Sequence, residues 1–261
     1  MDIFLIIGVI TGLGAIVVGM IVKGADVAVL INPAAAIIIL VGTFAAVMNS
    51  FPKHEFMKIP KIFGALFRDK KGESPVDLLN QIVELAQSTR KNGLLSLESI
   101  IPTLGNKFLQ KGLGLVVDGS EPSYIKEVLE MEISSVEERH RRGASVFTTA
   151  GGAAPTLGVL GAVIGLIGAL ADLEDTERLS HMIAAAFVAT LYGIFFGYVL
   201  FHPFANRLKR KSHEEVSNMY IILEGILGIQ EGKNPKAIEA KLLGMLEPKD
   251  QAEFEKTSNN S

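Results

Sequence analysis

Long stretches without charged side chains divide this chain into apolar and polar segments. Asp, Glu, Lys and Arg are absent from residues 3–22, 27–52, 143–171 and 179–206. Each stretch holds about 20 residues or more, the length that a helix needs to cross the hydrocarbon core of a bilayer. The backbone of a membrane span must satisfy its own hydrogen bonds, and these stretches have the wrong length and pattern for barrel strands. The pattern therefore predicts four transmembrane helices.

The polar segments set the topology. The connections 23–26 and 172–178 are short, whereas segments 53–142 and 207–261 are long and must share one side because an even number of spans separates them. All but two of the 25 basic residues fall in these long segments. By the positive-inside rule, that side is the cytoplasm. We expect an all-α polytopic membrane protein with four transmembrane helices in two hairpins, a helical cytoplasmic domain and both termini in the cytoplasm.

Four parts of the chain follow from this topology. Residues 1–52 form the first transmembrane hairpin, 53–142 a helical cytoplasmic domain, 143–206 the second hairpin, and 207–261 a cytoplasmic helix with a tail. Ser74 followed by Pro75 is typical of a helix start. An amphipathic helix begins after Pro122 and is expected to continue through the third span, from about 123 to 171. The polar tail from Pro248 to Ser261 is expected to be disordered.

Three of the predicted spans carry glycines four residues apart. The pairs are Gly8 and Gly12, Gly161 and Gly165, and Gly193 and Gly197. Such pairs let helix backbones approach closely, although glycine is also frequent in membrane helices generally. Together they favour a tightly packed and oligomeric bundle.

Composition excludes several classes of function. The net charge of −3 and the balanced polar segments argue against nucleic-acid binding, which requires a basic surplus. The chain has no Cys, so disulfides and Cys-ligated metals are excluded. The five histidines are scattered, and no phosphate loop or catalytic triad pattern is present. We expect neither an enzyme nor a resident cofactor.

The predicted spans lack an ionisable side chain at mid-membrane depth. A proton relay that works alone needs one. Thr156 and Thr190 supply hydroxyls there, which either coordinate an ion or water, or bond back to their own helices. If the chain conducts ions, the carboxylate must come from another chain. Pro155 and Pro203 lie near the cytoplasmic ends of the third and fourth spans, as static kinks or as hinges.

Four sequence motifs resemble the MotA family of flagellar stator subunits. The third and fourth spans, APTLGVLGAVIGLIGAL and AAAFVATLYGIFFGYVLFHPFANRLKRK, are similar to the paired spans of that family. INPAAAIIILVGT resembles its second span, and STRKNGLLSLE resembles its rotor-contacting segment. The motifs follow the family order from the first span to about Leu246.

The resemblance implies a stator in the bacterial inner membrane. Its subunits form a pentameric ring around two copies of MotB, a single-span partner that supplies an essential aspartate and binds peptidoglycan. Proton flow past this aspartate turns the ring against the rotor protein FliG.

The family pattern also implies roles for particular residues. Arg90 and Glu98 match the charged pair that faces the rotor, and Lys91 is a basic neighbour; the alternative is an ordinary solvated helix surface. Pro155 and Pro203 match two prolines associated with conformational change. Thr190 matches the threonine that faces the partner's aspartate.

One sequence position indicates whether the coupling ion is sodium or a proton. Sodium-driven members carry a second threonine seven residues after the third-span proline, where this chain has Ala162. Because sodium needs several oxygen ligands and a proton needs only water and the carboxylate, the alanine favours a proton.

Two alternatives compete with the stator interpretation. ExbB and TolQ proteins form related rings, but they have three spans and a different insert. A stand-alone channel or transporter would require a mid-membrane charge or the broken-helix symmetry of transporters.

Overall fold

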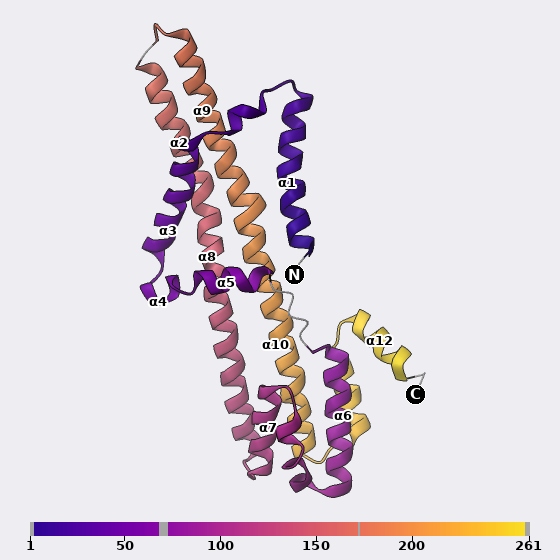
Figure 1. The fold of residues 1–261 in the computed structure, drawn as a ribbon. Coiled ribbons are helices and arrows are strands. Elements are labelled where there is room, and N and C mark those ends of the chain that lie inside the picture. The colour runs from indigo at the N-terminus through magenta and orange to yellow at the C-terminus, as the bar shows by residue number, and fades with distance from the viewer. Residues whose placement is uncertain (1–2, 68–72, 172, 259–261) are drawn as a thin grey trace. The chain divides into compact units, whose positions relative to one another are not determined.

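The computed structural model describes residues 3–67, 73–171 and 173–258, and these are helical with short connections. The chain divides into two compact units. We call residues 1–69 and 140–210 the span unit, and residues 70–139 and 211–261 the loop unit. Figure 1 labels the helices. Four helical segments are long and apolar enough to cross a membrane, which confirms the predicted number of spans.

The first hairpin of the span unit is built from short pieces after its first helix. Helix α1 (Ile3–Val22) is followed by η1 (Val27–Leu30), α2 (Pro33–Ala36), the π-helical η2 (Ile37–Val41) and α3 (Gly42–Ser50). The Asn32 side chain accepts a hydrogen bond from the Ala35 amide at 3.0 Å, and Pro33 occupies the first helical turn. This cap explains why the second span begins there.

The short helices α4 (Lys53–Phe56) and α5 (Ile59–Phe67) follow the first hairpin. The second hairpin comprises the span-unit part of α8 (Pro122–Leu170), then α9 (Thr176–Ile194), the π-helical η5 (Phe195–Phe201) and the start of α10 (His202–Gln230). The helix expected over 123–171 is confirmed, since α8 runs without interruption through Pro155. Asp172, the first residue of the predicted connection 172–178, lies outside the described residues.

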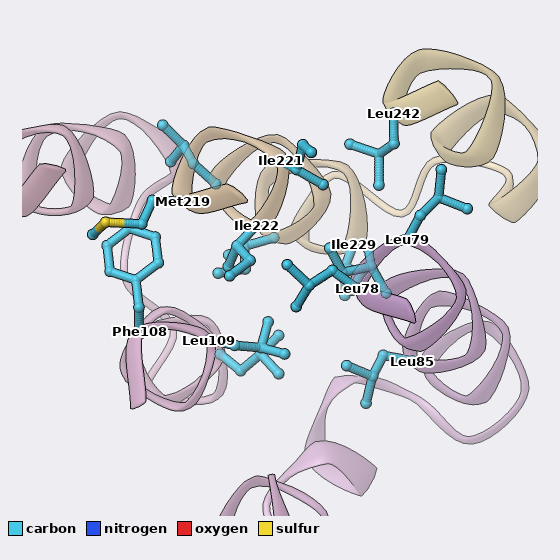
Figure 2. Close-up of a cluster of buried hydrophobic side chains, with 14 of the residues drawn as sticks. Leu78, Leu79, Leu85, Phe108, Leu109, Met219, Ile221, Ile222, Ile229 and Leu242 are labelled. Atoms are coloured by element: carbon cyan, nitrogen blue, oxygen red, sulfur yellow. The ribbon is translucent and has the colours of Figure 1, made fainter. Parts of the chain in front are cut away.

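The loop unit contains α6 (Pro75–Asn92), η3 (Leu94–Leu97), η4 (Ile101–Thr103), α7 (Lys107–Val117), α11 (Pro235–Leu243) and α12 (Pro248–Ser258), together with the outer parts of α8 and α10. Ser74 caps α6 by accepting a hydrogen bond from the Val76 amide at 3.3 Å, so the predicted helix start is confirmed. Figure 2 shows side chains from α6, α7, α10 and α11 meeting in one apolar core, among them Leu79, Leu109, Ile222 and Leu242.

The expected disorder of the tail is wrong for most of its length. Pro248–Ser258 form α12, and Phe254 is buried in the core of the loop unit. The Gln251 amide donates hydrogen bonds to the carbonyls of Leu243 and Leu246 at 3.1 and 2.9 Å. One apolar side chain and one amide therefore anchor an otherwise polar helix. Residues 259–261 of the predicted tail lie outside the described residues.

Candidate functional site

Small residues bring α8 and α9 into backbone contact. A Cβ placed on Gly158 would lie 3.0 Å from the Ala189 carbonyl oxygen and 3.3 Å from the Thr190 Cα. Gly161 lies equally close to Ala189, where a Cβ would be 2.9 Å from that side chain. The two helices can approach this closely only because α8 has glycines at these positions. The close approach provides the van der Waals packing that holds helices together in lipid.

The three glycine pairs have different roles. Gly161 with Gly165, and Gly193 with Gly197, serve packing inside the second hairpin, where an added Cβ at each would meet a neighbour at 3.0 Å or less. Gly12 contacts Val199 of η5, with a Cβ 2.7 Å from its Cγ1. Gly8 has nothing within 4 Å in the single chain. The predicted close packing is confirmed, and the contacts that explain it lie within one chain.

Thr190 lies on α9 beside this seam. Its side chain is half-buried, and its hydroxyl donates to the Ala186 carbonyl at 3.4 Å. Thr156, one residue after Pro155, is exposed and donates to the Gly152 carbonyl at 3.2 Å. Both hydroxyls thus bond back to their own helices in the single chain. The bond of Thr190 is long for a hydroxyl donor, so little free energy opposes its rotation toward another acceptor.

Pro155 and η5 meet at Gly197. Proline removes the amide that would bond to the carbonyl four residues earlier, here that of Gly151. A Cβ on Gly197 would lie 2.6 Å from the Pro155 ring and 2.9 Å from the Gly151 carbonyl oxygen. The Cα hydrogens of Gly197 therefore face the carbonyl that the proline leaves free, a geometry in which a weak C–H···O contact forms.

The fourth span is π-helical where it passes this proline. The His202 amide at the end of η5 donates to the Gly197 carbonyl, a bond that spans five residues. Pro203 comes next and is exposed on the first turn of α10. Wider π turns often occur at functional sites and next to prolines, because they accommodate a missing amide. Sequence reasoning missed η5 because its residues have no distinctive propensity.

Ala162 lies half-buried on α8, two turns after Pro155. Within the described part of the chain, no hydrogen bond joins the side chains of Thr156 and Thr190. The structure therefore places the candidate ion-path residues along one hairpin, with Thr190 against the Gly158 backbone, and leaves Thr156 on an exposed surface.

The candidate rotor-contacting charges gather around one turn of the loop unit. Arg90 and Lys91 occupy the last turn of α6, and Glu98 caps the end of η3; all three side chains are exposed. Gly93 has a φ of 81° and allows the sharp turn between the two elements. The Ser96 hydroxyl donates to the Gly93 carbonyl at 2.7 Å and stiffens it. Among the described residues, none of these three charges forms an ion pair with another side chain.

Tyr192 is a further residue that sequence reasoning missed. Its hydroxyl donates to the backbone carbonyl of Leu30, although the two residues are 162 positions apart. Its ring packs against the small cluster of Ala35, Val188 and Ala189. The only signal in the sequence is a tyrosine inside an apolar window, where a hydroxyl requires a partner.

Comparisons with known proteins place the chain in a family. Residues 6–93 match the family model for the Motility protein A N-terminal region, and residues 101–221 match that of the MotA/TolQ/ExbB proton channel family. The chain is 48% identical to Motility protein A of Bacillus subtilis over 97% of its own length and 94% of the relative's. The chain belongs to the MotA family.

Solved structures of stator complexes agree with this family assignment. The flagellar MotAB stator complex from Bacillus subtilis has a TM-score of 0.90 to this chain at 48% identity, covering 95% of this chain and 98% of the other. The C. jejuni MotAB structure also has a TM-score of 0.90, at 33% identity, covering 95% and 97%. This MotA-family chain is a multi-pass membrane protein and a stator subunit of the bacterial flagellar motor. The ExbB or TolQ alternative is not favoured.

Proposed function

We propose that five copies of this chain surround a single-span MotB-like partner in the bacterial inner membrane. The assembly converts proton flow into torque. The observation that carries the proposal is the lack of any Asp, Glu, Lys or Arg in residues 143–171 and 179–206, in which the histidines, His181 and His202, lie near the ends of the second stretch. A proton needs a group that accepts and releases it, so the partner must supply the carboxylate.

Thr190 is the residue proposed to meet that carboxylate. Its weak bond to Ala186 leaves the hydroxyl able to turn toward a second acceptor. Gly158 and Gly193 hold the surrounding backbone close, which fixes the position of Thr190 while its side chain rotates. Thr156 supplies a second hydroxyl along α8. This arrangement supports proton transfer by a water-linked path and requires no metal and no enzymatic chemistry.

The coupling ion is proposed to be a proton. Sodium must exchange its hydration shell for several oxygen ligands, and the methyl group of Ala162 offers none. A proton moves along water and hydroxyls, so the alanine costs it nothing. Pro155 and Pro203 are proposed as the hinges that respond to protonation, because Pro155 contacts the π-helical η5 and Pro203 follows it.

Arg90, Lys91 and Glu98 are proposed to contact the rotor protein FliG. Exposed ion pairs contribute about 0 to 1 kcal/mol each, which suits contacts that must form and break repeatedly. The mixture of charges at one stiff turn supports a partner surface with both signs of charge. The loop unit would then lie in the cytoplasm with both termini, as the basic residues near the span ends favour.

Motility in a stator-deficient host tests the proposal. The chain is expressed with the single-span partner encoded in its own genome, and swimming speed is measured in sodium-free medium. We expect swimming that a protonophore abolishes, and loss of swimming in Thr190→Ala at normal membrane levels. Swimming that depends on sodium and survives the protonophore would contradict the assignment of the proton as the coupling ion. Swimming without any partner would contradict the proposal that the partner supplies the carboxylate.

A further inference from the structure

Helix α5 crosses the spans at their ends. In Figure 1 it runs across the direction of the neighbouring part of α8 within the span unit. Its inner face, from Ile62 to Phe67, packs in a cluster with Phe147 of α8 and Phe204 of α10. The ring centroids of Phe67 and Phe204 are 6.1 Å apart, and those of Phe147 and Phe204 are 5.9 Å apart. A helix that runs across membrane spans at their ends has the orientation expected of a helix in the membrane interface.

The outer surface of α4–α5 combines apolar and basic side chains. Met57 is 69% exposed, although it is large and apolar. Phe63 is 44% exposed, and the rest of its ring packs against Phe147 and Phe204, with centroids 6.2 and 6.3 Å apart. Lys53, Lys58 and Lys61 are exposed on the same segment. Helices that lie in the membrane interface have this composition, with apolar groups at the boundary of the acyl chains and lysines at the headgroups.

The basic charge of α4–α5 is not neutralised by the described residues. Glu55 is the sole carboxylate in residues 53–67, and it forms an ion pair with Arg142 at 3.5 Å. His54 approaches the same carboxylate at 3.8 Å. Over the described residues, the three lysines form no ion pair with an acidic side chain. Three ammonium groups therefore lie on this segment without a counter-charge from the described residues.

We propose that α4–α5 binds the headgroups of anionic phospholipids through Lys53, Lys58 and Lys61, while Met57 enters the boundary of the acyl chains. Each lysine near an anionic surface favours binding by about fivefold, so three together give a preference on the order of 100-fold over zwitterionic lipid. Because the inner face of α5 contacts α8 and α10, the lipid would hold this segment against the span ends. This inference requires that the four predicted spans cross a membrane, and it does not depend on which ion drives the stator.

A single-tryptophan reporter tests this binding. The chain contains no Trp, so Met57→Trp introduces one fluorophore on the proposed surface. The full-length variant is reconstituted in vesicles that contain equal fractions of phosphatidylglycerol and phosphatidylcholine, with bromine on the acyl chains of one lipid or the other. We expect brominated phosphatidylglycerol to quench much more strongly. Equal quenching by the two lipids, or quenching by neither, would overturn the proposal.

Charge variants test whether the three lysines themselves cause the preference for anionic lipid. Lys53→Gln, Lys58→Gln and Lys61→Gln together should make quenching by the two lipids equal. The matched control is Lys107→Gln, Lys236→Gln and Lys249→Gln, three exposed lysines of the loop unit, and it should keep the preference. Phe63→Trp, at a ring that is 44% exposed, provides a second reporter if Met57→Trp fails to fold. Added inorganic phosphate should not reduce the preference, and competition by phosphate would overturn recognition of a lipid surface.

Discussion

Gly197 lies directly against the ring of Pro155. A Cβ on Gly197 would come within 2.6 Å of the proline Cγ and within 2.9 Å of the Gly151 carbonyl oxygen. The fourth span therefore passes the proline only because one of its residues has no side chain. This contact joins the π-helical η5 to the point where α8 lacks a backbone hydrogen bond.

Substitution of Gly197 should stop the motor. The Cβ of Gly197→Ala has no flexible neighbour to displace, so the helices must separate, at a cost of about 1 to 3 kcal/mol. We expect loss of soft-agar swimming at normal membrane levels. Gly14→Ala is the control, since nothing lies within 4 Å of a Cβ there. Wild-type swimming of Gly197→Ala would show that the contact is dispensable.

Tyr192→Phe should loosen the first hairpin. The variant keeps the ring and removes the hydrogen bond to the Leu30 carbonyl, which contributes about 1 kcal/mol. We expect a lower melting temperature of the detergent-solubilised chain. Tyr198→Phe is the matched control, because Tyr198 is 63% exposed and no described hydrogen bond involves its hydroxyl. Equal melting temperatures of the two variants would contradict a stabilising role for the bond.

Reversal of the charges around Gly93 should weaken rotor contact without unfolding the loop unit. Arg90→Glu and Glu98→Lys change exposed side chains, so the far-ultraviolet circular dichroism should match the wild type. We expect each variant to lower motor torque in a tethered-cell assay. Lys236→Glu, an exposed site on α11, should leave torque unchanged. If all three variants behave alike, the charged turn is not a specific contact.

Phe254→Ala should destabilise the loop unit. Its side chain is 8% exposed in the core, and loss of a buried phenylalanine costs about 3 kcal/mol. Proteolysis of the full chain should then release the C-terminal segment faster than in the wild type. Glu255→Ala, an exposed position on the same helix, serves as the control. Identical cleavage rates in wild type and Phe254→Ala would mean that α12 is not anchored by this side chain.

The spans and several helix ends were predictable because local rules determine them. Charge-free windows of sufficient length have few alternatives in a bilayer, and the Ser74–Pro75 start follows from backbone geometry. Helix α12 was missed because its composition is polar and its order depends on Phe254 reaching a distant core. The bond from Tyr192 to Leu30 joins residues far apart in the chain, and no spacing rule anticipates it.

The candidate site was only partly predictable. A lack of mid-membrane charge was readable from the sequence, and so was the position of each proline. The π-helical η5 was not, because it arises from the packing of Gly197 on Pro155 and from the missing amide of Pro203. The roles of Thr190, Ala162 and the charges near Gly93 stay predictions until they are tested by mutation.

The hydroxyls of Thr156 and Thr190 each donate to a carbonyl of their own helix, and glycine and alanine fill the seam between α8 and α9. Among the described residues neither hydroxyl donates to the other, so each would have to turn away from its own carbonyl before it could join a path for protons. A carboxylate is a stronger acceptor for the Thr190 hydroxyl than the Ala186 carbonyl, so in the proposed assembly the binding of the partner would itself open the path, and unassembled copies would not drain the proton gradient.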